Sequence, residues 1–178
     1  DKVDLLFGTF AKSMAGIGAF IACNEDNCNF LRYNMRSQTF AKSLPMPMVI
    51  GALKRLELLR TKPELREKLW TVVAALQTGL RAEGFDLGVT NSCVTPVYFQ
   101  GGVGEATSAV MDLRENYNVF CSVVGYPVIP KGQIMLRLIP TAMHTLEDVE
   151  YTIKAFSEIR QKLEEGKYNT SQIPTIME

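Results

Sequence analysis

The sequence predicts an α/β protein whose C-terminal part is a smaller α+β layer. Hydrophobic residues make up 47% of the 178 residues and charged residues 21%, a balance typical of a globular protein with a substantial core. Two short apolar runs near the start of the chain are typical of strands. After Gly84 the pattern changes, and strand-like and helix-like segments alternate towards the C-terminus.

The first third of the chain predicts two buried strands and a short helix. Apolar runs occupy residues 3–7 and 17–23, and the first run ends at Gly8. Runs of this length with few polar residues are typical of buried strands. Asn24 follows the second run and favours the start of a helix, which we expect to reach Tyr33.

A turn and two helices are expected next. Residues 39–47, TFAKSLPMP, predict a turn-rich crossing. Apolar residues then recur at helical spacing over residues 48–59. Pro63 ends this helix and begins another, because proline is favoured in the first turn of a helix and disfavoured inside it. The second helix is expected to end before Gly84.

The remainder of the chain predicts a strand-helix-strand-strand-helix layer. Short apolar runs predict the strands, and apolar residues at helical spacing predict the helices. Thr145 opens the final helix, and acidic residues in its first turn suit the positive end of the helix dipole. The expected strands are residues 94–99, 119–124 and 134–139, and the expected helices are residues 105–117 and 145–165.

The charge and composition argue against several classes of partner. Lysine and arginine total 19, as do aspartate and glutamate, so the net charge gives no reason to expect nucleic acid or a membrane surface. No apolar run in the sequence approaches the roughly 20 residues that span a bilayer. The first residues also lack a signal-peptide pattern. We therefore expect a cytoplasmic protein with no stable membrane insertion.

The cysteines and the single histidine argue against a metal site. The cysteines are scattered, without a CxxC pair, and zinc sites need several such ligands at short spacing. We expect reduced, mostly buried thiols and no bound metal. The four cysteines are Cys23, Cys28, Cys93 and Cys121.

The stretch GTFAKSMAGIG, residues 8–18, places Lys12 just after a predicted strand. A phosphate-binding loop would need glycine directly before the lysine, and Ala11 stands there, which excludes this class of site. A lysine that forms a Schiff base needs the end of a strand, a nearby hydroxyl such as that of Thr9 for a cofactor phosphate, and small residues after it. All three are present, and the stretch alone leaves an exposed loop lysine as the alternative.

Three stretches, in the same order, resemble one family of enzymes. They are GTFAKSMAGIGAF, FAKSLPMPMVIGALKRLELL and GYPVIPKGQIMLRLIPTAMHTLEDVE. Together they resemble the α-oxoamine synthases, pyridoxal-phosphate-dependent enzymes that include 8-amino-7-oxononanoate synthase, 2-amino-3-ketobutyrate CoA ligase and serine palmitoyltransferase. The resemblance spans nearly the whole chain and corresponds to the C-terminal portion of such an enzyme. It implies the aminotransferase-like architecture, fold type I, and we expect the chain to be a piece of a longer polypeptide.

The resemblance implies which residues bind the cofactor. Lys12 matches the lysine that binds pyridoxal phosphate covalently and acts as a general base, and Thr9 matches a hydroxyl contact to its phosphate. In this family a second phosphate contact comes from the partner subunit, through a segment that reads FAKS here. Ser43 is retained and Lys42 supplies a charge, whereas Ala41 replaces a serine. A solvent-facing Lys42 is the alternative.

The resemblance also implies the substrate side of the site. Arg137 matches the arginine that binds the substrate carboxylate, and a guanidinium can hold a carboxylate with two hydrogen bonds. Its apolar surroundings, IMLRLI, favour a specific partner, although a plain surface arginine on an edge strand is the alternative. His144 is predicted to be structural, and Pro127, Pro130 and Gly132 are predicted to shape the loop before Arg137.

The activity implied by the resemblance is the decarboxylative condensation of glycine, alanine or serine with an acyl-CoA, releasing CoA and carbon dioxide. It also implies a homodimer with the site at the subunit interface. An aminotransferase of the same fold is one alternative. A non-catalytic pseudo-enzyme subunit is another, favoured by Ala41 and Lys42. Because other residues of the site belong to the N-terminal half in this family, we expect these 178 residues alone to be inactive and to bind the cofactor weakly.

The resemblance also implies how the chain is divided into domains. Residues 1–62 are predicted to be the end of the large cofactor-binding domain and a connecting helix. Residues 63–165 are predicted to form the small C-terminal α+β domain. The polar residues 166–178 are predicted to be a loosely held tail.

Overall fold

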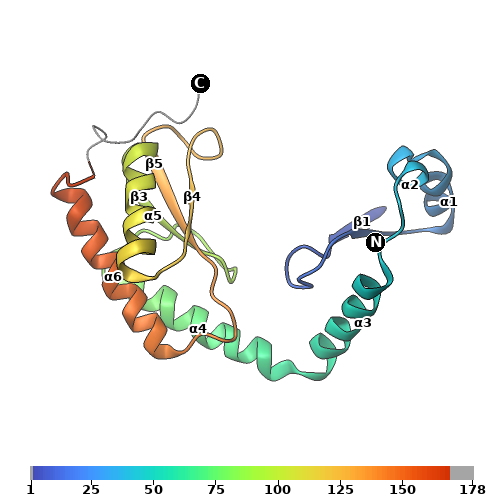
Figure 1. Cartoon of the computed structure of the whole chain (residues 1–178), viewed down its shortest axis with the longest axis horizontal. Helices are drawn as coiled ribbons and strands as arrows, with labels where there is room; N and C mark the ends of the chain where they lie inside the picture. The colour runs from blue at the N-terminus through green and yellow to red at the C-terminus, as the bar shows by residue number, and fades with distance from the viewer. Residues whose placement is uncertain (1, 169–178) are drawn as a thin grey trace. The chain divides into compact units, whose positions relative to one another are not determined.

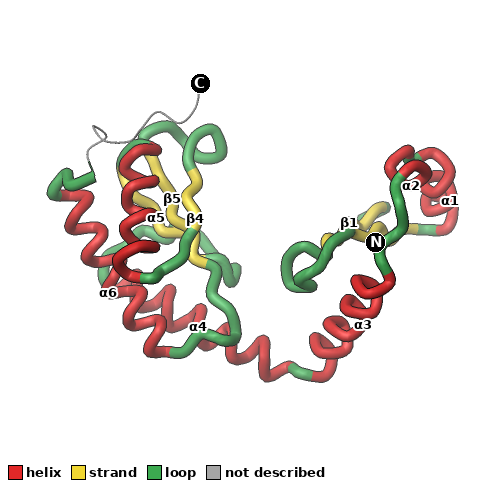
Figure 2. Tube along the Cα trace, viewed as in Figure 1, coloured by secondary structure: helices red, strands yellow, loops and turns green. Residues whose placement is uncertain are grey.

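The structure is a computed structural model that describes residues 2–168. The chain divides after Pro63 into two compact units, the first containing a two-stranded hairpin and the second a three-stranded sheet (Figure 1). Figure 2 shows that long helices make up much of the second unit. No helix within residues 2–168 has both the length and the apolar composition needed to cross a membrane.

The first unit opens with an antiparallel hairpin of β1 (Leu5–Thr9) and β2 (Ala19–Cys23). Both predicted strands are confirmed, but the predicted burial is wrong. No side chain within residues 2–63 is buried, and Phe7 is 68% exposed. A hairpin has two faces, and one pair of strands cannot cover both. The apolar side chains of this hairpin therefore need a cover from outside the unit.

Three helices complete the first unit. α1 (Glu25–Asn34) begins as predicted, because the side chain of Asn24 accepts a hydrogen bond from Asn27 N at 2.9 Å. α2 (Arg36–Phe40) was not predicted, because its five residues are too short to show a helical period. α3 (Met46–Thr61) extends the predicted helix by two residues at each end.

The second unit contains a long helix followed by the predicted strand-helix-strand-strand-helix layer. Its elements are α4 (Pro63–Ala82), β3 (Thr95–Gln100), α5 (Val103–Tyr117), β4 (Ser122–Val124), β5 (Gln133–Leu138) and α6 (Leu146–Glu164). The sheet order is β3-β5-β4, and both strand pairs are antiparallel. In Figure 1, α5 and α6 lie side by side next to this sheet.

One face of the sheet supports the core. Val97 on β3 lies opposite Leu136 on β5, and both side chains are fully buried. Because successive side chains of a strand point to opposite faces, Tyr98 and Arg137 lie on the other face, which α4, α5 and α6 leave open. The helices contribute these side chains to the core: Val72, Leu76, Leu80, Ala109, Leu113, Val149, Ala155, Phe156 and Ile159.

Removing one methyl group from this core is expected to be measurable. Ile159 on α6 is completely buried, so Ile159→Val is expected to cost about 1 kcal/mol of unfolding free energy through lost contacts and a small cavity. The same substitution at Ile139, which is 55% exposed, is the matched control and is expected to cost less than about 0.5 kcal/mol. Urea unfolding followed by circular dichroism measures both variants, and equal costs at the two positions would contradict this account of the core.

A cluster of polar side chains connects α5 to the end of α6. Asp112 accepts hydrogen bonds from Lys162 Nζ at 2.7 Å, from Asn116 Nδ2 at 2.6 Å and from the hydroxyl of Tyr168. Burial acts to raise the pKa of Asp112, but these hydrogen bonds and the Lys162 charge outweigh burial and lower it below its ordinary value. Tyr168, which donates its hydroxyl to Asp112, also packs against the core.

This contact bears on the predicted tail of residues 166–178. Residues 166–168 form a turn, and Tyr168 is hydrogen bonded to Asp112 and packed against the core. Residues 169–178 lie outside the described residues.

Acid is expected to remove the contribution of Asp112 to stability. Because its pKa is lower in the folded than in the unfolded chain, the contribution is present above the ordinary pKa of 3.8 and is lost as the pH falls through the folded value. The urea midpoint of the second unit should therefore fall between about pH 5 and about pH 2. Asp112→Asn should show a smaller fall, whereas Glu115→Gln, at an exposed position, should behave like the unmodified chain. An unchanged acid dependence in Asp112→Asn would refute the assignment.

Candidate active site

Lys12 lies in the loop between β1 and β2, and the backbone of the loop holds its shape. Phe10 N donates to Gly18 O at 2.9 Å, and Gly16 N donates to Phe10 O at 2.7 Å. Ala15 N donates to the carbonyl of Lys12 at 2.8 Å, which makes a tight turn around the lysine. The side chain of Lys12 is exposed, so its amine is accessible in a loop of defined backbone.

Thr9 lies at the base of the same loop. Its Oγ1 accepts a hydrogen bond from Ala11 N at 3.1 Å, and its hydroxyl lies 3.5 Å from Gly18 O. The second distance is long for a hydroxyl donor, so the hydroxyl proton is only weakly held there. Thr9 can therefore turn its hydroxyl towards a ligand without losing a strong bond.

The segment that carries Lys42 and Ser43 packs against the Lys12 loop. A Cβ at Gly18 would come within 2.9 Å of the Leu44 side chain, so Leu44 lies directly on the end of this loop. Gly18 also has φ of +104°, a conformation that favours glycine. Lys42 and Ser43 themselves are exposed. The structure thus brings their segment to the Lys12 loop, although it describes no contact between either side chain and Lys12.

Arg55 on α3 is a cation beside this loop that the sequence did not reveal. Its guanidinium Nη1 lies 3.0 Å from the position of a Cβ at Gly51 and 3.6 Å from that of a Cβ at Gly16. Neither glycine has a side chain to displace the guanidinium, so Arg55 fits between the helix and the loop. Gly16 and Gly51 make room for the guanidinium, but they are 35 residues apart, so the sequence alone did not indicate that they lie close together.

Arg137 belongs to the second unit, where it lies on the open face of the sheet. It is exposed on β5, opposite Pro96 of β3 and Ser122 of β4. Its Nε donates a hydrogen bond to Ser122 Oγ at 3.1 Å. Ser122 is a second residue that the sequence did not reveal, because the contact depends on the register of two strands.

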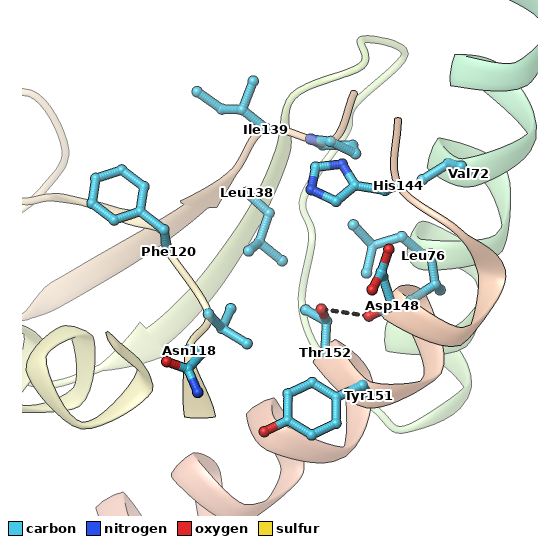
Figure 3. Close-up of a pocket in the computed structure, with 13 residues that line it drawn as sticks. Val72, Leu76, Asn118, Phe120, Leu138, Ile139, His144, Asp148, Tyr151 and Thr152 are labelled. Atoms are coloured by element: carbon cyan, nitrogen blue, oxygen red, sulfur yellow. Dashed lines mark hydrogen bonds between the residues drawn. The ribbon is translucent and has the colours of Figure 1, made fainter. Parts of the chain in front are cut away.

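His144 lies away from Arg137, in an open hollow of about 360 Å³ on the helix side of the second unit (Figure 3). Its Nδ1 accepts a hydrogen bond from Thr141 N at 2.9 Å, and the next residue, Thr145, caps α6 by accepting from Asp148 N at 3.1 Å. These contacts support a structural role for His144.

Pro127, Pro130 and Gly132 lie in the connection between β4 and β5, as the sequence suggested.

The cysteines are less buried than the sequence suggested. All four are free thiols, but only Cys121 is buried, and the other three are half-buried. Burial raises the pKa of the Cys121 thiol to about 11, so this thiol is unreactive at neutral pH. Within residues 2–168 no three histidine, cysteine or acidic side chains gather closely enough to hold a metal ion.

The comparisons with known proteins decide the family. Residues 1–156 match the model of aminotransferase class I and II. The chain belongs to this family. Among its relatives in the family, it is 60% identical over 168 residues to the cysteate-C-fatty acyltransferase of Capnocytophaga ochracea, covering 94% of this chain and 40% of that protein. It is 32% identical over 164 residues to the serine palmitoyltransferase of Sphingobacterium spiritivorum, covering 92% of this chain and 41% of that protein.

Solved structures of serine palmitoyltransferases also match this chain. A serine palmitoyltransferase variant from S. paucimobilis with bound PLP and myriocin matches with a TM-score of 0.80 and 28% identity, over 91% of this chain and 41% of that chain. The serine palmitoyltransferase of Sphingomonas wittichii matches with a TM-score of 0.80 and 28% identity, over 97% of this chain and 41% of that chain. The predicted resemblance to the α-oxoamine synthases and the predicted architecture are confirmed. This aminotransferase-family chain spans about 40% of the length of the relatives it matches.

Proposed function

We propose that the full-length protein is a pyridoxal-phosphate-dependent C-acyltransferase that condenses cysteate with a fatty acyl-CoA. The observation that carries the proposal is the 60% identity to a cysteate-C-fatty acyltransferase over 94% of this chain, against 32% to a serine palmitoyltransferase over 92% of it. Cysteate thus replaces glycine, alanine and serine as the preferred amino acid. Its side chain ends in a sulfonate, which distinguishes it from all three.

The residues of the first unit fit the cofactor. Lys12 offers an exposed amine on a loop whose backbone is fixed, and Thr9 offers a hydroxyl whose proton is weakly held. Glycines at the loop keep side chains out of the space beside it. Lys12 would bind the cofactor aldehyde and Thr9 its phosphate. Ser43 and Lys42 would contact the phosphate in the partner subunit of a homodimer.

The net reaction replaces the carboxyl group on Cα of the amino acid with the acyl group, and the Cα–H bond is broken and remade on the way. When bound, pyridoxal phosphate withdraws electrons from Cα. The amine of Lys12 would take the Cα proton and later return it. Arg137 holds the carboxylate with its two terminal nitrogens. The electron pair left at Cα forms a bond to the acyl carbon as the carbon–sulfur bond of the thioester breaks and the thiolate leaves as CoA. The Cα–carboxyl bond then breaks to release carbon dioxide, and Cα takes the proton back.

The test uses the full-length protein with cysteate, serine, alanine and glycine, each with a long-chain acyl-CoA. Release of free thiol measures turnover, and borohydride reduction followed by peptide mapping measures the covalent adduct on Lys12. We expect kcat/KM to be at least about tenfold higher for cysteate than for serine, a discrimination that one specific charge contact can supply.

Three other results would each reject the proposal in a different way. A preference for serine, alanine or glycine rejects cysteate as the substrate. Transfer of the amino group without CoA release selects an aminotransferase. Absence of any reduced adduct on Lys12 selects a pseudo-enzyme subunit.

A further inference from the structure

A serine lies next to the arginine that we propose to bind substrate. The register of β4 and β5 sets Ser122 directly opposite Arg137. Both side chains lie on the open face of the sheet, because side chains alternate along a strand and the fully buried Leu136, next to Arg137 on β5, points to the core side. The two side chains therefore meet across the strands on the face that the helices leave open.

The hydrogen bond between them uses only one of the five N–H groups of the guanidinium. Arg137 Nε donates to Ser122 Oγ at 3.1 Å. For the part of the chain that the structure describes, no hydrogen bond or ion pair involves the two terminal nitrogens of Arg137. These two nitrogens carry the other four N–H groups, and one N–H from each can point to one oxygen of a carboxylate. Ser122 thus binds the guanidinium through Nε and leaves both terminal nitrogens available to a carboxylate.

Of the two described residues directly opposite Arg137, only Ser122 has a polar atom in its side chain. On β3 the residue opposite Arg137 is Pro96, whose side chain has no polar atom. The hydroxyl of Ser122 is therefore the acceptor that fixes rotation of the guanidinium about the bond between Cδ and Nε.

We propose that Ser122 is a positioning residue that orients the fork of Arg137 towards the α-carboxylate of the amino acid. The inference rests on the proposed function, since it takes Arg137 as the carboxylate-binding residue. Ser122 does not itself touch the substrate. Losing its hydroxyl leaves the positive charge of Arg137 in place but frees the guanidinium to rotate. Amino-acid binding is weakened and not abolished.

The experiment measures dissociation constants of full-length Ser122→Ala from the change in the absorption spectrum of the bound cofactor. We expect the constants for cysteate and for alanine to rise by the same factor, about 3- to 10-fold, as loss of one hydrogen bond predicts. Alanine has the carboxylate without the sulfonate, so an equal factor assigns the effect to the carboxylate. The KM for acyl-CoA and the thermal midpoint should not change.

Three further variants separate positioning from a general effect on the fold. Ser122→Thr keeps a hydroxyl and should bind both amino acids as the unmodified enzyme does. Ser157→Ala removes a serine hydroxyl from α6, near Glu83, and should change neither constant. In an Arg137→Leu background, Ser122→Ala should have no further effect, because Ser122 acts through Arg137.

Several outcomes would overturn the inference. They are unchanged constants in Ser122→Ala, a rise for cysteate alone, a weakened Ser122→Thr, or an additive double variant. These outcomes differ from a failure of the proposed function, in which the unmodified enzyme itself does not bind cysteate or release CoA from acyl-CoA. If Ser122→Ala unfolds, Ser122→Cys, which keeps the size of the side chain with a much weaker acceptor, gives the same comparison.

Discussion

Lys12→Ala in the full-length protein is expected to lower turnover by at least about 10³-fold, because the variant loses both a covalent anchor and a general base. The exposed amine of Lys12 stands in a loop held by its own backbone hydrogen bonds, so the truncation should leave the loop folded. Thiol release from acyl-CoA measures the loss. Borohydride reduction should no longer attach the cofactor at position 12.

Lys54→Ala is the matched control for this experiment. Lys54 is an exposed lysine of the same unit that pairs with Glu57 at 2.7 Å on α3. Its truncation should leave turnover within about twofold, because exposed ion pairs contribute little. Turnover above a tenth of normal in Lys12→Ala, or a reduced adduct on another lysine, would show that Lys12 is not the cofactor lysine.

Arg137→Leu is expected to raise the dissociation constant for the amino acid by about 100-fold, because a carboxylate would lose a charged partner with two hydrogen bonds. Arg137→Lys keeps the charge but not the planar fork, and an intermediate rise of about 10-fold is expected. Since Arg137 is exposed on the open face of the sheet, neither variant should lower the thermal midpoint appreciably. Spectral titration with cysteate measures the effect.

Arg81→Leu, at an exposed position in the last turn of α4, controls for loss of a positive charge in the same unit. It should bind cysteate normally. If Arg137→Leu also binds normally, the arginine is an ordinary surface residue, which is the alternative that the sequence left open.

The elements that the sequence predicted well are those with local markers. Asn24, Pro63 and Thr145 each begin a helix within one residue of the expected position, because capping and proline geometry depend only on neighbouring residues. β4 was predicted as residues 119–124, but only Ser122–Val124 pair with β5. Asn118 has φ of +54°, and Val119 and Cys121 are buried in the core without joining the ladder, so an apolar run here did not mean a strand.

The sequence suggested candidate site residues where they lie close together in the chain or match motifs of the family that the chain resembles. Thr9 and Lys12 belong to one loop, so a single stretch of sequence was enough to suggest both. Arg55 and Ser122 could not be found in this way. The Arg55 guanidinium lies beside Gly16 of the loop, which is far from it in sequence, and Ser122 lies opposite Arg137 through strand register.

Residues 2–63 contain no buried side chain, whereas the second unit has a core of its own. The two units of the isolated chain should therefore differ in their resistance to proteases. Cleavage requires local unfolding, and segments with few buried contacts open most readily. Trypsin should therefore trim the chain from its N-terminal side and leave a resistant fragment that begins near Pro63, which mass spectrometry would identify. If the full-length protein supplies a cover for these apolar side chains, the hairpin that carries Lys12 should resist trypsin there.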